Sequence, residues 1–395
     1  MYPKLRFKGF DDAWEQRKFG DMTIRESKTG ESSKNLPCVE YEDVVCDNGV
    51  LNKDLSLKDA IKKGILFDGS QVLYGKLRPY LHNWLLPDFK GVAVGDWWVL
   101  RPKGVDKKFI YRLIQTQQFD DVTNLSSGSK MPRADWKLVS NTEFAIPCST
   151  EEQMKIGLYF EHLDNLITLH QRQCEALKKQ KRFFLQNMFP KEGESVPRIR
   201  FNGFTEPWEQ RKLKEIACKV KNKNKENAIS ETFTNSAEFG IISQKEFFDH
   251  EVASKTNLDS YYIVDIDDFV YNPRISVTAP VGPINRNKLG KAGVMSPLYT
   301  VFKTQGVSID FLEHYFKSTN WHSYMYLNGD SGARSDRFSI KDDVFFDMPI
   351  MVPCIKEQMQ IGLLFNAISK NITLHQRELD TLKKLKKGLL QNMFV

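Results

Sequence analysis

The chain has 395 residues, of which 41% are hydrophobic and 12% aromatic, so it is too apolar for a disordered protein and long enough for two or more domains. Its net charge of +7 permits a polyanionic partner without requiring one. Six cysteines without a Cys-x-x-Cys pair exclude a disulfide scaffold and match no zinc pattern. No apolar run reaches membrane-spanning length, and we expect reduced thiols and a cytoplasmic location.

The first element in chain order is a short segment that occurs twice. Residues 3–18 read PKLRFKGFDDAWEQRK and match residues 197–212 at 10 of 16 positions. We call these two stretches the WEQRK segments. Their separation of 194 positions indicates an internal duplication in which each half begins with the same segment.

A variable stretch, residues 19–151, follows the first WEQRK segment and predicts a mixed α/β domain. Residues 91–100 are apolar enough for a buried strand, and residues 109–119 have helical spacing. Two basic elements follow glycines, GKLRPY from Gly75 and a Gly-x-Lys-x-x-Arg loop from Gly128. Glycine lets the backbone approach a ligand, and arginine can bond bidentately to guanine. Such loops suit DNA contact, although a surface salt bridge explains a single loop equally well.

Residues 152–189 predict a long helix, because apolar positions recur in steps of three and four with no proline. Residues 357–394 repeat it with 22 of 38 positions identical, at an offset of 205. Each helix would be roughly 57 Å long, and its apolar stripe needs a partner. We expect the two helices to pair as an antiparallel coiled coil, with packing of each on its own domain as the alternative. The predicted seam consists of Ile156, Phe160, Leu163, Ile167, Leu177, Ile361, Phe365, Ile368, Ile372 and Leu382.

Polar residues of these helices allow two interpretations. The basic runs at residues 178–182 and 383–387 could face phosphate or a membrane, but a solvated face that complements the helix dipole is favoured. His170 and His375 occupy the same Leu-His-Gln-Arg position in both copies. A metal is conceivable there, but the pattern favours polar seam residues that fix the helix register, and we predict no metal site.

The second variable stretch, residues 213–356, differs from the first at most positions but shares a few elements with it in the same order. Residues 293–302 repeat the buried strand, a Gly-x-Arg-x-x-Arg loop ends at Arg337, and residues 271–274 stand roughly where GKLRPY stands. The sequence therefore predicts a mixed α/β fold with pseudo-two-fold duplication. Its parts are residues 1–151 and 190–356, each a WEQRK segment with a variable domain, and the helices at residues 152–189 and 357–395.

Signatures of catalysis are scarce. The sequence lacks a Walker ATP motif, G-x-G-x-x-G, the Asn/Asp-Pro-Pro-aromatic methyltransferase motif, G-x-S-x-G and H-E-x-x-H. Asp88, Asp106 and Lys108 fit a loose nuclease pattern, PD…(D/E)xK, that arises often by chance. Asp106 also precedes an apolar-periodic stretch, as a helix N-cap does. We therefore predict no enzyme activity and no cofactor bound by this chain.

The duplicated EQMKIG…ITLHQR…LLQNMF helices, the FxGFxxxWEQRK segments, and the GKLRPY and GxRxDR elements together resemble the specificity subunit of Type I restriction–modification systems. The resemblance covers essentially the whole chain. It implies two target-recognition domains, each of which reads one half of a bipartite double-stranded DNA site, with the helices setting the gap. A non-catalytic scaffold whose variable domains bind proteins is the alternative.

The resemblance also implies partners and site residues. Two methyltransferase subunits would carry S-adenosylmethionine and methylate adenine N6, and endonuclease/translocase subunits would use ATP and Mg²⁺. The WEQRK segments and the helices would form part of the methyltransferase-docking surface. The implied DNA contacts are Lys76, Arg78, Tyr80, Lys130, Arg133, Arg274, Arg334 and Arg337.

Overall fold

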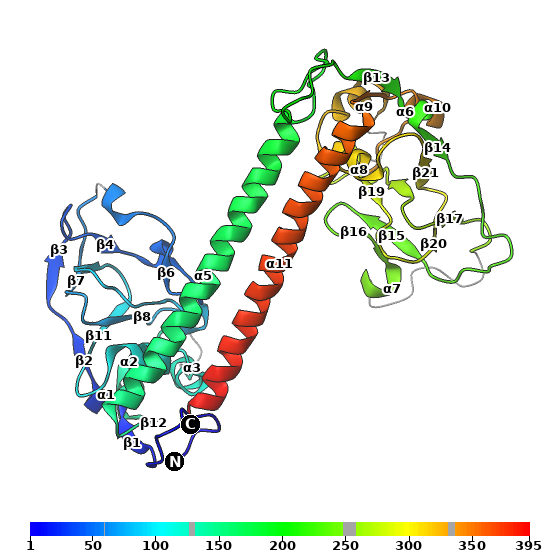
Figure 1. The fold of residues 1–395 in the computed structure, drawn as a ribbon. Helices are drawn as coiled ribbons and strands as arrows, with labels where there is room; N and C mark the ends of the chain where they lie inside the picture. Colours follow the sequence, from blue (N-terminus) through cyan, green and yellow to red (C-terminus); the bar gives the residue numbers. More distant parts are fainter. Residues whose placement is uncertain (59, 126–130, 248–257, 331–335) are drawn as a thin grey trace. The chain divides into compact units, whose positions relative to one another are not determined.

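The structure is a computed structural model that describes residues 1–58, 60–125, 131–247, 258–330 and 336–395. Two long helices, α5 (Thr150–Asn187) and α11 (Ile355–Met393), lie within two residues of the predicted bounds at either end (Figure 1). The chain forms two compact units, unit 1 (Met1–Gln173 with His375–Val395) and unit 2 (Cys174–Leu374). The repeats suggested a division at the ends of the helices. The units instead divide each helix midway, because each half groups with the domain on which it packs.

The variable domain of unit 1 is mixed α/β. One sheet has the strand order β3-β7-β10-β4, another has β2-β11-β8-β9, and β1 pairs with β12 as β5 does with β6. The strands are β1 (Glu15–Lys18), β2 (Thr23–Glu26), β3 (Thr29–Glu31), β4 (Cys38–Val39), β5 (Val44–Val45), β6 (Val50–Leu51), β7 (Lys63–Phe67), β8 (Val72–Gly75), β9 (Trp84–Leu85), β10 (Gly91–Ala93), β11 (Trp97–Pro102) and β12 (Glu143–Ile146). The helices are α1 (Phe19–Met22), α2 (Lys107–Leu113), α3 (Gln117–Asn124) and α4 (Trp136–Asn141), with 3₁₀ turns η1 (Tyr41–Asp43), η2 (Leu55–Leu57) and η3 (Pro79–Leu81).

The variable domain of unit 2 repeats this plan. The sheet β14-β21-β18-β19 corresponds to β2-β11-β8-β9, and β13 pairs with β22 as β1 pairs with β12. The strands are β13 (Glu209–Lys212), β14 (Ala217–Lys219), β15 (Phe233–Ser236), β16 (Gly240–Ser243), β17 (Tyr262–Val264), β18 (Phe269–Tyr271), β19 (Ile284–Arg286), β20 (Gly293–Met295), β21 (Thr300–Thr304) and β22 (Pro349–Val352). The helices are α6 (Leu213–Ile216), α7 (Gln244–Phe247), α8 (Ile309–Lys317), α9 (His322–Asn328) and α10 (Asp342–Phe346).

The apolar run at residues 91–100, expected as one strand, is two strands in two sheets. Gly95 has φ +102°, a conformation that favours glycine, and the chain turns there between β10 and β11. The corresponding run at residues 293–302 is divided in the same way between β20 and β21. Hydrophobicity marked both halves as buried, but it could not reveal the turn that directs them to different sheets.

The helices pair antiparallel within each unit, as predicted. In unit 1, Phe160 lies against Phe394 with ring centroids 6.2 Å apart, and Asp164 binds Lys386 at 2.7 Å. In unit 2, Lys181 donates a hydrogen bond to Ser369, and Phe189 stacks on Phe365. As residue numbers rise along α5, the numbers of the contacting residues in α11 fall, as expected for antiparallel helices. Of the predicted seam residues, Leu177, Ile372 and Leu382 are half-buried, and the others are buried.

The first turns of each helix also pack into the core of a variable domain. Ile156, Phe160 and Leu163 belong to the unit 1 core, and Ile361 and Phe365 belong to the unit 2 core. A Cβ at Gly157 would lie 2.5 Å from the Lys108 Cβ, so the glycine lets α2 approach. Both expected packing modes thus occur, and Phe160 takes part in both.

Each WEQRK segment is joined to the start of a long helix by a buried ion pair. Arg6 binds both carboxylate oxygens of Glu152 at 2.7 and 2.8 Å. Arg200 binds Glu357 in the same bidentate way at 2.8 Å. Both glutamates are almost completely buried, so the two repeated motifs of the sequence meet in space.

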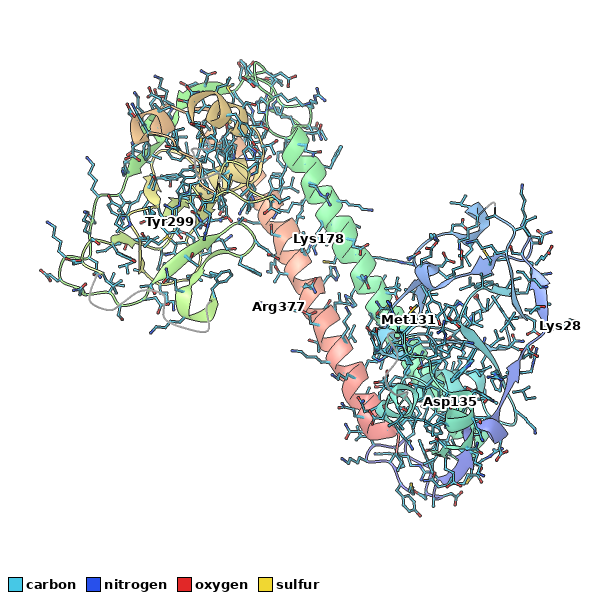
Figure 2. The ribbon with its side chains drawn as sticks, turned by 180° about the vertical axis from the view of Figure 1, so that it is seen from behind. Lys28, Met131, Asp135, Lys178, Tyr299 and Arg377 are labelled. Atoms are coloured by element: carbon cyan, nitrogen blue, oxygen red, sulfur yellow. The ribbon has the colours of Figure 1, made fainter. Side chains whose placement is uncertain are left out.

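The basic runs near the helix ends are not uniformly solvated. Most of the lysines in these runs are exposed. Figure 2 shows that Lys178 of the first run, and Arg377, which precedes the second run on α11, extend from the helix surface. Lys181 and Lys386 are exceptions, because they lie half-buried between the helices and burial lowers the pKa of both. The solvated-face interpretation therefore fails at these two positions.

Candidate nucleic-acid interface

The two basic elements of the first variable domain meet in space. Leu77 and Arg133 are opposed in an isolated antiparallel bridge. The Arg78 amide donates to the Pro132 carbonyl at 2.7 Å, and the Ala134 amide donates to the Lys76 carbonyl at 2.9 Å. These hydrogen bonds join GKLRPY to the loop that contains Arg133, about 55 positions further along the chain.

The GKLRPY loop holds Arg78 and Tyr80 in exposed positions on a fixed backbone. Arg78 and His82 both adopt the left-handed conformation, with φ +49° and +51°, on either side of η3. His82 stacks on Trp84 and lies 2.6 Å from an Asp47 carboxylate oxygen. Within the described part of the chain, the Arg78 guanidinium has no ion pair, so it is available to an anionic ligand.

Asp96, which the sequence did not single out, neutralises two of the predicted contacts. Its carboxylate lies 3.0 Å from an Arg133 nitrogen and 3.5 Å from Lys76 Nζ. Burial alone would raise the pKa of Asp96, but these two cations outweigh it and lower the pKa. The Tyr41 hydroxyl donates to the Asp96 carbonyl at 2.5 Å and accepts from the Leu77 amide. Asp96 and Tyr41 therefore position the basic loops, and nothing in their local sequence marks them.

The second variable domain builds the same junction with different residues. Arg274 and Arg337 are opposed in an isolated antiparallel bridge. The Ile275 amide donates to the Asp336 carbonyl at 3.0 Å, and the Phe338 amide donates to the Pro273 carbonyl at 2.7 Å. The hydrogen bonds flank the bridge as they do in unit 1. Arg274 thus occupies the place of Leu77 rather than that of Arg78.

Arg274 and Arg337 form a like-charged cross-strand pair. Bridges flanked in this way bring side chains especially close, and like charges directly opposite each other are unfavourable. Among the described residues, the acidic partner of Arg337 is its neighbour Asp336 at 4.0 Å, and Arg274 has no ion pair. Leu298 stands where Asp96 stands in the first domain, so that neutralising carboxylate is missing from this position. The junction carries concentrated positive charge that an anionic ligand would relieve.

Two predicted contacts, Lys130 and Arg334, lie outside the described residues. Two residues of the nuclease pattern, Asp106 and Lys108, have structural partners. Asp106 is the N-cap of α2, as predicted, and accepts a hydrogen bond from the Phe109 amide. Lys107 Nζ binds two backbone carbonyls, and Lys108 pairs with Glu161 at 2.7 Å.

Comparison with known proteins agrees with this architecture. Residues 11–179 match the family model of the Type I restriction modification DNA specificity domain. The chain is 24% identical over 282 residues to the Type I restriction enzyme MjaVIII specificity subunit of Methanocaldococcus jannaschii, with 67% of this chain and 64% of that protein covered. The region that matches the family model covers less than half of the chain, and the chain is similar to Type I restriction enzyme specificity subunits.

Two further relatives extend the comparison. It is 27% identical to the putative MjaX specificity subunit of the same organism, over 61% of this chain and 56% of that one. The chain thus spans less than two thirds of the length of either curated relative. Its fold resembles the Type I S subunit from M. genitalium with a TM-score of 0.60 at 12% identity, and the alignment covers 100% of this chain and 99% of that one. In the described residues, no helix has the length and apolarity to cross a membrane.

Proposed function

We propose that this chain is a sequence-specific DNA-binding subunit that recognises a bipartite double-stranded site, one half through each variable domain. The observation that carries the proposal is the opposed pair Arg274 and Arg337, two arginines on facing backbone positions with little neutralisation. Phosphate oxygens or a guanine edge would supply the acceptors that this pair lacks. Arg78 and Tyr80 play the matching role in the first domain.

We further propose that the chain performs no chemistry itself. In this proposal it directs two methyltransferase subunits, which hold S-adenosylmethionine, to adenine N6 in each half-site. Endonuclease/translocase subunits that use ATP and Mg²⁺ complete the complex. The WEQRK segments and the long helices would supply part of the docking surface, and the length of the helix pair would set the gap between the half-sites.

The first experiment is a genome-wide map of N6-methyladenine in source cells with and without this chain. Loss of one split, asymmetric motif upon deletion is the expected result, and it supplies both half-sites. If no motif changes, either the partner subunits are inactive or the assignment is wrong. Co-purification of a methyltransferase subunit with this chain would indicate inactive partners, and its absence would indicate a wrong assignment. A DNA-binding subunit should lose retention on DNA steeply as salt rises, whereas absence of retention even at low salt would favour a protein-binding scaffold.

The second experiment assigns a half-site to a residue. Arg337→Ala is expected to relax recognition of one half-site only and to reduce the slope of log K against log salt by about 1 if the residue contacts a phosphate. Lys225→Ala is the matched control, because it removes one exposed positive charge elsewhere in unit 2. Equal losses at both half-sites, or equal effects of the two variants, would contradict a local contact.

A further inference from the structure

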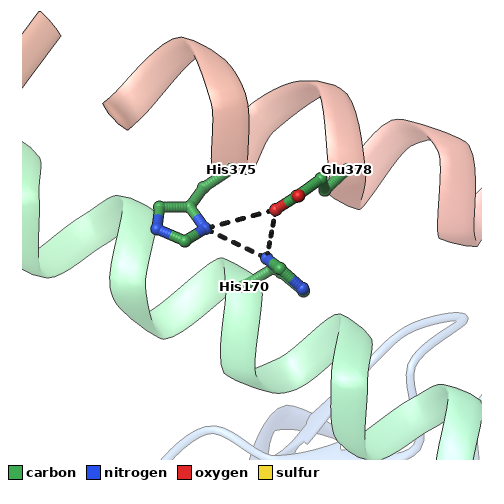
Figure 3. Close-up of side chains that lie close together, drawn as sticks. All are labelled: His170, His375 and Glu378. Carbon is green, nitrogen blue, oxygen red and sulfur yellow. Dashed lines mark hydrogen bonds and ion pairs between the residues drawn. The ribbon is translucent and has the colours of Figure 1, made fainter. Parts of the chain in front are cut away.

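Three potential metal ligands converge between α5 and α11 in unit 1 (Figure 3). His170 Nδ1 lies 3.0 Å from His375 Nδ1 and 3.0 Å from a Glu378 carboxylate oxygen. His375 Nδ1 lies 3.5 Å from the same oxygen. The three side chains are partly buried, and that of Glu378 retains 44% of its exposure, so an ion could enter from solvent.

Hydrogen bonds alone cannot satisfy this triangle. A neutral imidazole carries at most one proton on Nδ1, and a carboxylate carries none. Two protons at most are therefore available for three close contacts. If both protons point to the carboxylate, two N–H groups face each other across 3.0 Å, and in any other arrangement at least two lone pairs face each other.

A divalent cation satisfies all three atoms at once. Zinc binds histidine nitrogen and carboxylate oxygen at about 2.0–2.2 Å in tetrahedral geometry, which places ligand atoms roughly 3.3 Å from one another. The observed separations of 3.0, 3.0 and 3.5 Å bracket that value. Two imidazoles and one carboxylate suit a first-row transition metal such as Zn²⁺ better than Mg²⁺ or Ca²⁺.

We propose that His170, His375 and Glu378 form a binding site for a divalent transition metal, with Zn²⁺ the best match, that clips α5 to α11. The fourth position would hold water, because no fourth side-chain ligand from His, Cys, Asp or Glu joins this group among the described residues.

The internal duplication explains how the site arises. His170 and His375 are the same position of the repeat, and antiparallel pairing places this position opposite its own copy. Glu378 breaks the symmetry, because its counterpart in α5 is Gln173. A metal here would join residues 205 positions apart and constrain a long loop of the unfolded chain, so its binding should stabilise the folded helix pair.

The test uses the full chain, stripped of metal with a chelator and then titrated with ZnCl₂. We expect one tight equivalent of bound zinc, a thermal midpoint that rises by several degrees, and reversal by chelator. His170→Gln, His375→Gln and Glu378→Gln should each weaken binding ~10-fold or more and abolish the shift. His162→Gln is the matched control, because His162 is an exposed histidine of α5 outside the group, and it should behave as wild type.

Two further measurements are needed. One establishes whether each variant folds, and the other establishes whether zinc binds at this site rather than elsewhere on the chain. Circular dichroism of the metal-free variants establishes whether each one folds. On the wild-type chain, Zn²⁺ should protect His170 and His375, but not His162, from modification by diethyl pyrocarbonate. Absence of a tight equivalent, equal protection of all three histidines, or zinc binding that survives every ligand substitution would overturn the proposal.

Discussion

Phe394 packs edge-on against Trp14, with ring centroids 6.2 Å apart, and Phe189 packs in the same way against Trp208, also at 6.2 Å. Each phenylalanine follows the last turn of one long helix, and each tryptophan belongs to a WEQRK segment. α5 thus begins in the core of unit 1 and ends in the core of unit 2, while α11 does the reverse. Each core is completed by residues from both halves of the sequence.

Phe394→Ala is expected to destabilise unit 1 by ~3–5 kcal/mol, because it leaves a cavity among Trp14, Phe109 and Phe160. Phe189→Ala should do the same to unit 2. Calorimetry of the full chain measures both effects, without the assumption of a single two-state transition. Phe183→Ala is the control, since that side chain is 52% exposed. A loss in Phe183→Ala as large as in Phe394→Ala would refute the assignment of Phe394 to the core.

Glu152→Gln should cost ~3–5 kcal/mol of unfolding free energy, because Arg6 would lose its carboxylate in a mostly buried site. The adjacent Glu151→Gln is a close control, because its side chain is 72% exposed and, among the described residues, its ion pair is with Lys155, so a change of ~0–1 kcal/mol is expected. Urea denaturation of both variants provides the comparison. Similar midpoints for the two variants would show that the Arg6–Glu152 pair contributes little.

The stability of unit 2 should fall in acid through His314. Burial lowers the pKa of His314 to about 4, although a hydrogen bond with Asn366 and the charge of Glu313 oppose the shift. The unfolded chain therefore binds more protons than the folded chain between pH ~4 and ~6.5, and unfolding free energy rises with pH across this window. The contribution is fully present above ~6.5 and falls by roughly 3 kcal/mol toward pH 4.

His314→Gln removes this titration and should flatten the dependence of stability on pH. Asp268, whose pKa burial raises to about 6, titrates in the same window with the opposite sign. It is present in both proteins, so the difference between their curves isolates His314. Parallel curves from pH 4 to 7 would show that His314 titrates alike in the folded and unfolded chains.

Asp96→Asn should strengthen retention on DNA, because Lys76 and Arg133 lose the carboxylate that neutralises them. The slope of log K against log salt should become steeper by about 1–2 if the freed cations contact phosphates. Asp88→Asn makes the same change in net charge at an exposed position, and it should alter retention less. Equal gains for the two variants would indicate a general charge effect rather than release of the junction.

Deletion of residues 175–181 together with residues 368–374 removes one heptad from each helix at positions that face each other through Lys181 and Ser369. The gap in the recognised DNA site should shorten by about 10 Å, or roughly 3 base pairs. Methylation mapping of cells that express the shortened chain reads the new gap directly. An unchanged gap would contradict the proposed spacing role of the helices.

The sequence by itself determined the duplication, the two long helices, the buried face of each helix and the basic loops, because periodicity and repetition are local properties of a chain. Only the tertiary structure decided which residues meet. The division of one apolar run at Gly95, the neutralisation of Lys76 and Arg133 by Asp96, and the meeting of His170 with His375 depend on contacts between distant positions. Such contacts reflect the combined packing of a whole unit, and no single segment encodes them.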